Sequence, residues 1–365
     1  MMRMAVKGIG VTGGFGCGVD DLRRALADGR SPLETISVST AGGPVELPAF
    51  RAATDRLEEF VAKRTLRRID NFSRMGLLGA YQALADAGML ESDHSRMGVI
   101  VASGYGATST TFAFLDSLIN DGDICASPTH FANSVHNAAA ANISIQLGAT
   151  GPSLTVSQFD MSVPSALLTA RQWLAEGRVD SVLFGAIDEL SELIAYIWLR
   201  QRGSGGNSPP NPLNTGEDTA VLGEGAAFFL LTRAEEETDG YCAIDGVTTG
   251  CLWSSAPPLI PERLTLLGAD GRGEFGSRYR DVVSPGAACS CYTPLYGSFP
   301  AGQAFDLAVA ALILKEGQIF ASPGSSAADI SGTVAPIGEF QQPGRVACLT
   351  LAGDDDYGLV TLDRL

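Results

Sequence analysis

The chain has 365 residues, of which 45% are hydrophobic and 18% are charged, a composition that excludes a wholly disordered protein. Its 25 Lys and Arg residues against 41 Asp and Glu give a formal net charge of −16 at pH 7. Nucleic acids and anionic membranes are bound by basic surfaces, so this charge argues against either as a partner. No stretch approaches about 18 uninterrupted apolar residues, so we expect no membrane span.

In chain order, short apolar runs predict strands that alternate with helices. The expected strands are residues 5–11, 97–102, 154–157, 180–185, 226–232 and 346–352, and the expected helices are residues 19–29, 71–88, 107–118, 137–147, 161–177 and 304–314. Because this alternation is typical of sheets covered on both faces, it predicts an α/β fold with largely parallel sheets. Residues 201–215 and 269–276 are rich in glycine, proline or polar residues and are predicted to be loops.

The seven cysteines are scattered, and their spacing does not match a zinc site. We therefore expect reduced thiols, a cytoplasmic location and no bound metal. Residues 1–16 lack the layout of a signal peptide, which agrees with that location. The glycine-rich turn at residues 13–16 has neither the dinucleotide-binding spacing nor a P-loop lysine, so we expect no nucleotide cofactor.

Several segments resemble β-ketoacyl synthases, in the family's order and with the family's spacing. LRRIDNFSR at residues 66–74, followed by ALADAG at 83–88, is similar to the family's N-terminal signature. GPSLTVS at residues 151–157 resembles the strand that enters the nucleophile turn, and LGEGAA at 222–227 resembles the segment before a central strand. The resemblance implies a thiolase-like, five-layered αβαβα fold of two βα halves. We place these halves at residues 1–238 and 239–365, the second one shortened.

The catalytic residues that this resemblance implies are missing. The family's cysteine nucleophile follows the strand by three residues, and here that residue is Asp160. The family's two catalytic histidines lie in the second half, whereas all three histidines of this chain precede residue 137. Ser298 stands at about the position of the second histidine, in a segment similar to the family's. The first histidine should fall near residues 283–287, which contain none.

Two interpretations of Asp160 remain open. Its carboxylate could cap the helix that follows by accepting the unpaired N–H groups of the first turn, and Pro164 fits that register. Alternatively Asp160 is a catalytic carboxylate, although an acyl-aspartyl anhydride would hydrolyse readily. Without a histidine in the second half, Cys289 and Cys291 are interpreted as structural thiols. His130 and His136 are likewise interpreted as structural.

This pattern implies a non-catalytic subunit similar to the chain length factors of type II polyketide or aryl-polyene synthases. Such a subunit pairs with an active ketosynthase and shapes the tunnel that holds the growing chain. The shortened second half favours the aryl-polyene type. Acyl carrier proteins are acidic like this chain, so we expect the carrier to dock on the ketosynthase partner. Two alternatives remain: an active acyltransferase or decarboxylase that uses Asp160, and a homodimeric acyl-binding pseudoenzyme.

The resemblance also implies where the partner and the tunnel lie. The family dimerises through the sheet edge at residues 151–160 and through the segment 104–136. A helix in that segment lines the end of the tunnel, and here Thr108, Phe112 and Leu115 share one face of it at helical spacing. We expect this face to be the tunnel floor; the alternative is ordinary core packing.

Overall fold

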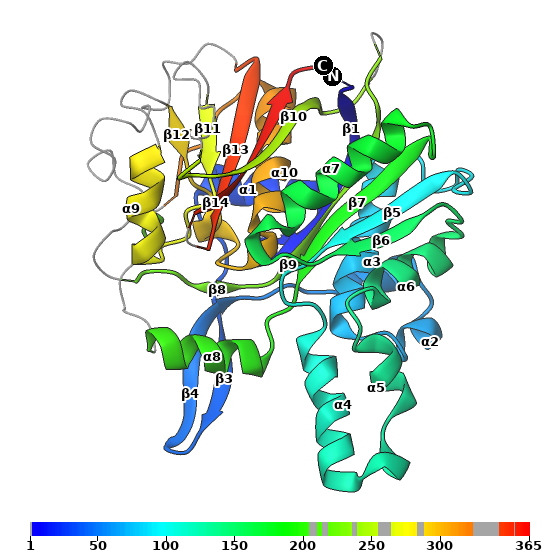
Figure 1. Cartoon of the computed structure of the whole chain (residues 1–365), viewed down its shortest axis with the longest axis vertical. Helices are drawn as coiled ribbons and strands as arrows, with labels where there is room; N and C mark the ends of the chain where they lie inside the picture. The colour runs from blue at the N-terminus through cyan, green and yellow to red at the C-terminus, as the bar shows by residue number, and fades with distance from the viewer. Residues whose placement is uncertain are drawn as a thin grey trace.

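The computed structural model describes residues 2–203, 210–213, 218–235, 239–254, 264–282, 288–323, 343–353 and 355–365. A large sheet runs through the described part, in the strand order β12-β11-β13-β14-β10-β1-β9-β7-β5-β6 (Figure 1). Its first half comprises β1 (Met4–Gly13), β9 (Gly225–Arg233), β7 (Ser181–Asp188), β5 (Met97–Ala102) and β6 (Ser153–Val156). Its second half comprises β10 (Cys242–Cys251), β14 (Asp356–Asp363), β13 (Arg345–Ala352), β11 (Leu264–Leu267) and β12 (Cys289–Ser290).

The two halves of the sheet repeat one pairing pattern. In the first half β6, β5 and β7 run parallel, and β9 and β1 then follow antiparallel. In the second half β12, β11 and β13 run parallel, and β14 and β10 follow antiparallel. The halves join where β1 pairs with β10. The expected pair of βα halves is therefore present in the fold.

The expectation of largely parallel sheets is wrong, because the middle of the sheet is antiparallel. Strands β7, β9, β1, β10, β14 and β13 are joined by antiparallel pairings, and only the outer strands are parallel. Only three residues separate β13 from β14 in the chain, and so short a link can only give antiparallel neighbours. Strands β10 and β14, both of the second half, are absent from the strands that the sequence predicts.

Two helices form the middle layer of the molecule. α7 (Ser162–Ala175) packs on β5 and β7 of the first half and on β10 and β14 of the second. α10 (Gln303–Glu316) packs on β13 and β10 and also on β1 and β9, and it is buried from Gln303 to Leu314. α3 (Asn71–Asp86) covers the other face of the first half, and α9 (Gly273–Val282) places Tyr279 in the core cluster of β13 and β14. These are the five layers of a thiolase-like fold.

The crossing of β1 and α3 depends on glycine. A Cβ atom on Gly10 would lie 2.0 Å from the carbonyl oxygen of Gly79, and a Cβ atom on Gly79 would lie 2.6 Å from the ring of Phe228. Only glycine permits such a close approach of backbones. The helix begins after Asp70, whose carboxylate accepts the N–H of Ser73 at 3.3 Å as an N-cap.

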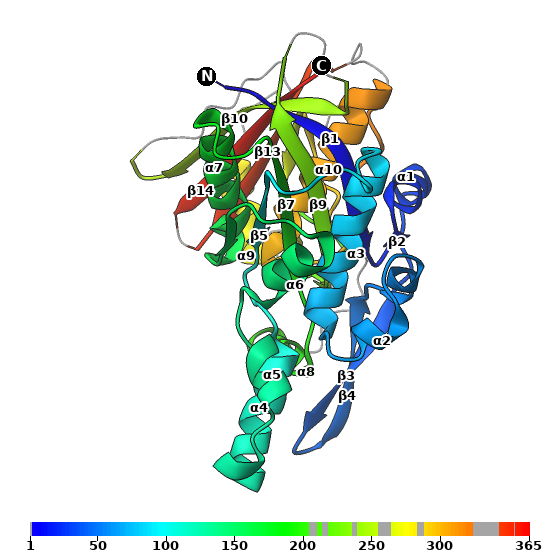
Figure 2. The same ribbon diagram turned by 90° about the vertical axis from the view of Figure 1, so that its right-hand side faces the viewer.

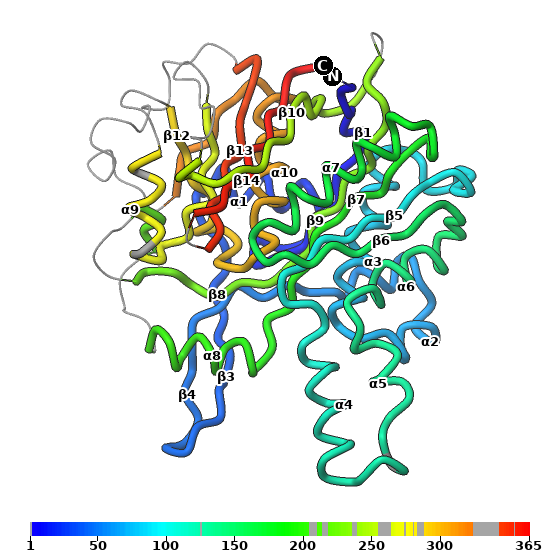
Figure 3. The backbone as a smooth tube through the Cα atoms, in the orientation of Figure 1, coloured from blue at the N-terminus to red at the C-terminus, as the bar shows by residue number. Residues whose placement is uncertain are grey.

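An arm projects from this body. It comprises α4 (Thr108–Asp121), the short η2 (Asp123–Cys125) and α5 (Pro128–Asn133), and Figure 3 traces the chain out along α4 and back along α5. Figure 2 shows the arm extending beyond the sheet layers. The rings of Phe114 and Phe131 lie 5.4 Å apart and hold the two helices together. Beside the arm lie α8 (Glu192–Arg202) and a hairpin of β3 (Glu34–Thr40) and β4 (Gly43–Phe50), which also pairs with β8 (Leu222–Gly223).

The two ends of the described chain meet at one place. β1 and β14 are the two neighbours of β10, and the Arg3 guanidinium lies 4.0 Å from the carboxylate of Asp363. Figure 1 marks both ends at the same corner of the molecule. Among the described residues, none of the helices combines the length and the apolar character that crossing a membrane requires.

Candidate functional site

The turn between β6 and α7 holds Asp160 in a strained segment. A short 3-10 turn, Phe159–Met161, separates the strand from the helix, which begins at Ser162. Phe159 adopts a positive φ of 45°, a backbone conformation that is strained for an aromatic residue. The buried hydroxyl of Ser162 accepts the N–H of Gln158 at 2.8 Å and lies 3.1 Å from the carbonyl oxygen of Ser103. These contacts fix the turn against the end of β5.

Asp160 does not cap α7, so the N-cap interpretation is wrong. The helix starts two residues later and has no side-chain cap, because the 3-10 turn carries the carboxylate away from the first helical N–H groups. The carboxylate instead lies 3.9 Å from the guanidinium of Arg272, with 21% of the Asp160 side chain exposed. Pro164 does lie in the first turn of the helix, as expected.

Arg272 joins Asp160 to the second half of the molecule. Its guanidinium lies 2.7 Å from the carboxylate of Asp270, which the hydroxyl of Ser298 also contacts as a hydrogen-bond donor. It also stacks on the ring of Phe275, 4.3 Å from the ring centre. Asp270 and Ser298 are almost fully buried. The cluster of Asp160, Arg272, Asp270 and Ser298 is the candidate site.

The electrostatics of the cluster leave Asp160 easy to protonate. Burial raises the pKa of the Asp160 carboxyl to about 6; the Arg272 cation opposes this rise and the Asp270 anion adds to it. The cluster offers a carboxyl able to exchange a proton near neutral pH, and an arginine already neutralised by two acids. It offers neither a thiolate nor an imidazole.

Two clefts open on Asp160, and Phe159 lines both of them. One, of about 490 Å³, is largely apolar and is lined by Tyr105, by Ile194, Ile197 and Trp198 of α8, and by Phe275 and Phe299. The other, of about 630 Å³, is lined by Ser165, Thr249, Cys251 and Asp356 among others. Phe159 borders both clefts and is 65% exposed. An apolar chain fits the first cleft better than a polar substrate does.

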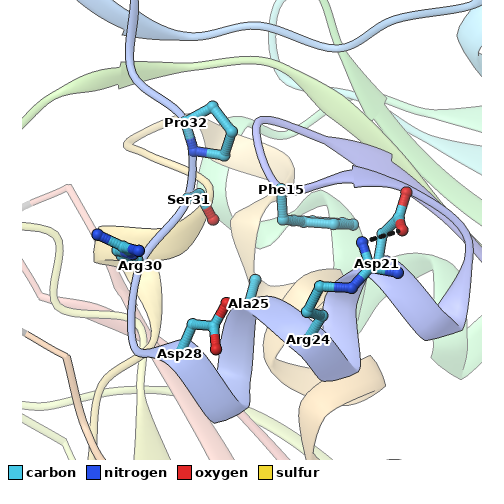
Figure 4. Close-up of a pocket in the computed structure, with 8 residues that line it drawn as sticks. All are labelled: Phe15, Asp21, Arg24, Ala25, Asp28, Arg30, Ser31 and Pro32. Carbon is cyan, nitrogen blue, oxygen red and sulfur yellow. Dashed lines mark hydrogen bonds and ion pairs between the residues drawn. The ribbon is translucent and has the colours of Figure 1, made fainter.

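A further hollow, of about 460 Å³, lies beside α1 (Val19–Asp28) and is lined by Phe15, Asp21, Arg24 and Arg30 among others (Figure 4). Two of its four charged side chains, Asp21 and Arg24, already pair with each other. The Asp21 carboxylate accepts the guanidinium of Arg24 at 2.9 Å and the N–H of Cys17 at 2.9 Å. We therefore assign it no function.

The predicted tunnel residues lie on the arm rather than in the chain's own core. Phe112 is 40% exposed and Leu115 is 38% exposed, while the Thr108 hydroxyl donates to the Ser191 hydroxyl at 2.9 Å. Ordinary packing in the core of this chain therefore does not explain the stripe of Thr108, Phe112 and Leu115. Its role as a tunnel floor stays a prediction.

The sequence missed two members of the cluster. The position of the first histidine was expected near residues 283–287, which lie outside the described residues. The side chains that face Asp160 beside Ser298 are instead Asp270 and Arg272, which directly follow β11. Charged residues after a buried parallel strand were the available signal, because ligands bind where such strands end. The prediction of a loop is confirmed for residues 269–272 and wrong for 273–276, where α9 begins at Gly273, and the glycines of this segment gave no indication that its charged side chains reach Asp160.

Cys289, Cys291 and His94, which could in principle carry chemistry, lie in surroundings typical of structural residues. Cys289 and Cys291 are buried; burial raises the pKa of the Cys289 thiol to about 12 and raises the pKa of the Cys291 thiol well above its ordinary value. The ring nitrogens of His94 contact the carbonyl oxygens of Leu147 and Met89 at 3.1 and 3.0 Å. Within the part of the chain that the structure describes, no group of three His, Cys, Asp or Glu residues could hold a metal ion.

The family model described as "Beta-ketoacyl synthase, N-terminal domain" matches residues 1–237. The chain belongs to the β-ketoacyl synthase family. Among its relatives are a 3-oxoacyl-[acyl-carrier-protein] synthase 2 of Vibrio harveyi, 26% identical over 64% of this chain and 58% of that protein, and a putative polyketide β-ketoacyl synthase 1 of Streptomyces halstedii, 28% identical over 68% and 63%. The chain thus spans about 60% of the length of these curated synthases.

Solved ketosynthase structures share the fold over the whole chain. The ishigamide ketosynthase/chain length factor superposes with a TM-score of 0.82 at 17% identity, covering 100% of this chain and 99% of its own. A ketosynthase in complex with its chain length factor from Xenorhabdus doucetiae gives a TM-score of 0.76 at 17% identity, covering 100% and 98%. The β-ketoacyl synthase match in sequence stops at residue 237, whereas the likeness in fold continues to the end.

The strain at Phe159 leads to a prediction about stability. Replacing Phe159 with glycine is expected to stabilise the isolated chain by about 1 kcal/mol, because glycine accepts a positive φ without strain. Denaturant unfolding monitored by circular dichroism measures the change. Phe159→Ala is the control, since alanine removes the ring but keeps the strained backbone. Equal stabilisation by alanine and glycine would show that the ring's exposure is responsible.

Proposed function

We propose that this chain is a non-catalytic subunit that pairs with an active β-ketoacyl-ACP synthase and shapes its chain tunnel, as a chain length factor. The observation that carries the proposal is the cluster at the nucleophile turn. An aspartate stands where the family's cysteine is expected, and Arg272 links it to Asp270 and Ser298. No histidine lines either cleft at Asp160 in the described residues, and the lone cysteine there, Cys251, has no histidine beside it.

The surface that would meet the partner is open in this chain. β6 ends the described sheet and pairs there with β5 alone, so one side of the strand is free. Beside it lie the exposed side chains of Leu154 and Phe159 and the apolar faces of the arm. Two of the similar structures, by their titles, join a ketosynthase and a chain length factor. These features support a heterodimer formed through this edge.

The setting of the proposed complex follows from the same likeness. We propose a cytoplasmic synthase of the aryl-polyene or type II polyketide kind, with the acyl carrier protein docking mainly on the ketosynthase. The six cysteines whose side chains the structure describes are free thiols, which suits a reducing compartment. Whether the product is a polyene or another polyketide follows from the partner and its tunnel.

Co-purification tests the pairing. The chain is expressed with a ketosynthase encoded beside it that retains Cys, His and His, and the mass of the purified species is measured by light scattering. We expect a stable one-to-one complex, since permanent interfaces bury more than about 2,000 Å². A clean monomer beside that ketosynthase would contradict the proposal.

Because the nucleophile turn carries no thiol, we expect acyl donors not to acylate this chain. Incubated alone with acyl-carrier or acyl-CoA donors, the chain is expected to gain no stable acyl group in intact-mass spectrometry. A stable adduct that persists in Asp160→Asn would place the reaction at another residue. An adduct that disappears in Asp160→Asn would support the alternative in which Asp160 is a catalytic carboxylate.

The stripe on α4 predicts control of product length. Phe112→Ala is expected to lengthen the product of the assembled complex, because removing the ring leaves room for further two-carbon units. The cost in stability of the isolated chain should stay under about 1 kcal/mol, well below the roughly 3–5 kcal/mol of a buried Phe→Ala, because Phe112 is 40% exposed. Phe114→Ala is the matched control, since Phe114 stacks on Phe131 instead. Unchanged product length in an intact Phe112→Ala complex would remove Phe112 from the tunnel.

A further inference from the structure

The pairing face, defined as β6 together with the arm, contains no lysine or arginine of its own. The sequence has none from residue 97 to residue 170, a stretch that includes β6, α4, α5 and α6 (Ala138–Leu147). It does contain acids, and Asp116, Asp121 and Asp123 are all exposed. Asp121 and Asp123 flank the turn between α4 and η2, at the end of the arm farthest from the body (Figures 1 and 2).

The acids sit among apolar side chains that require a partner. Ile119 and Phe131 are exposed on the arm, and Ile124, between Asp123 and Cys125, is 95% exposed. Exposed apolar side chains gathered in this way mark interaction surfaces. Whatever covers them must also desolvate or neutralise the neighbouring carboxylates, which is costly without cations.

Symmetry decides which partner can supply those cations. In a two-fold dimer of identical chains, the pairing face meets a copy of itself. The acids of each arm would then meet a face that has no lysine or arginine of its own. Arg64, Arg67 and Arg68 lie at and beyond α2 (Lys63–Leu66), at the root of the arm, where the Asn133 amide donates to the carbonyl oxygen of Arg68. They lie away from the acidic tip.

We infer that the arm selects its partner by charge: it fits a ketosynthase whose facing surface carries lysines or arginines, and it disfavours a second copy of this chain. This inference rests on the proposed function, which supplies the partner class. Complementary charge raises the rate and specificity of association, and like charge penalises the wrong pairing. The apolar side chains and the free edge of β6 provide the affinity, and the acidic side chains determine which partner binds.

A charge reversal tests the inference. The reversed-arm variant carries Asp116→Lys, Asp121→Lys and Asp123→Lys. The control variant carries Asp28→Lys, Asp55→Lys and Asp281→Lys, which change the net charge equally at exposed positions outside the pairing face. Binding to the co-expressed Cys-His-His ketosynthase is measured at 0.05 and 0.5 M salt. We expect the reversed arm to bind at least tenfold more weakly at low salt, and the control to bind within threefold of the natural chain.

A second measurement uses only this chain. The natural chain and the reversed-arm variant are each expected to be monomeric at low micromolar concentration, and their mixture is expected to form a mixed dimer at low salt. The inference is overturned if the natural chain alone forms a salt-insensitive dimer, if the mixture stays monomeric, or if reversal leaves ketosynthase binding unchanged. If the natural chain binds no ketosynthase but the mixed dimer forms, the proposed function is contradicted. The inference that charge on the arm selects the partner would still be supported.

Discussion

Replacing Asp188 with alanine is expected to destabilise the protein by at least about 4 kcal/mol, a large part of the stability of a typical domain. Asp188 is fully buried at the end of β7. One carboxylate oxygen accepts the Ser103 hydroxyl at 3.0 Å and the N–H groups of Gly104 and Tyr105 at 2.9 and 2.7 Å. The other accepts the N–H of Ala301, from the second half of the chain, at 2.8 Å.

The alanine variant leaves four buried donors without an acceptor, and each unpaired donor costs about 1–3 kcal/mol. Urea unfolding of soluble protein, or the loss of soluble protein on expression, gives the result. Asp188→Asn is the companion variant. The amide nitrogen of asparagine cannot accept a hydrogen bond, so this variant should lose the contacts of one carboxylate oxygen only. Its free energy of unfolding should lie between those of the alanine variant and the natural chain. If Asp188→Ala unfolds within 1 kcal/mol of the natural chain, the carboxylate does not hold the halves together.

The second large effect concerns Glu189 and pH. This side chain is buried at the root of the arm, where its carboxylate accepts the N–H of Ser109 at 3.3 Å. Burial, together with the neighbouring carboxylates of Asp70 and Glu224, raises the pKa of the Glu189 carboxyl to about 7, and the hydrogen bond from Ser109 opposes this rise. The folded protein therefore holds this proton more tightly than the unfolded chain, whose glutamate has a pKa near 4.5.

The sign of the pH effect follows from that difference. Below about pH 4.5 Glu189 is protonated in both the folded and the unfolded state, so its ionisation does not lower the free energy of unfolding. The contribution of the protonated side chain to stability is then fully present. Between about pH 4.5 and 7 the unfolded chain releases the proton first, and stability falls by about 3 kcal/mol in total. Glu189→Gln abolishes this titration, so its stability relative to the natural chain should rise by that amount between pH 4.5 and 8. Asp28→Asn, at an exposed acid, is the control, and a flat Glu189→Gln difference across this range would refute the assignment.

The sequence predicted those parts of the fold whose signal is local. The buried strand at 97–102 is an uninterrupted apolar run, and the helix from Asn71 has a capping aspartate before it, so both were placed correctly. The hairpin of β3 and β4 was missed, since β4 contains two prolines, which weaken a strand signal. β10 was missed because both of its neighbours in the sheet, β1 and β14, lie more than 100 residues away in the chain.

The same division holds for the site. Asp160 was located from the sequence because the strand, the turn and Pro164 are neighbours in the chain. Arg272 and Asp270 were not located, because their place beside Asp160 exists only after the two halves have packed. The N-cap interpretation failed for a local reason: the 3-10 turn delays the helix to Ser162, which counting along the sequence does not reveal.

β1 and β14 are the two neighbours of β10, so the first and last strands lie close together in the sheet. The two halves could therefore follow each other along the chain in either order. A short linker could join the last strand to the first, and new ends could open between β9 and β10, without breaking any strand. In such a circular permutant the second half would leave the ribosome first. The arm would then be made after the whole second half, but still before β6, α7, β7 and β9 of its own half. Because both present ends lie by β10, at the far end of the body from the arm, fusions there keep clear of the arm.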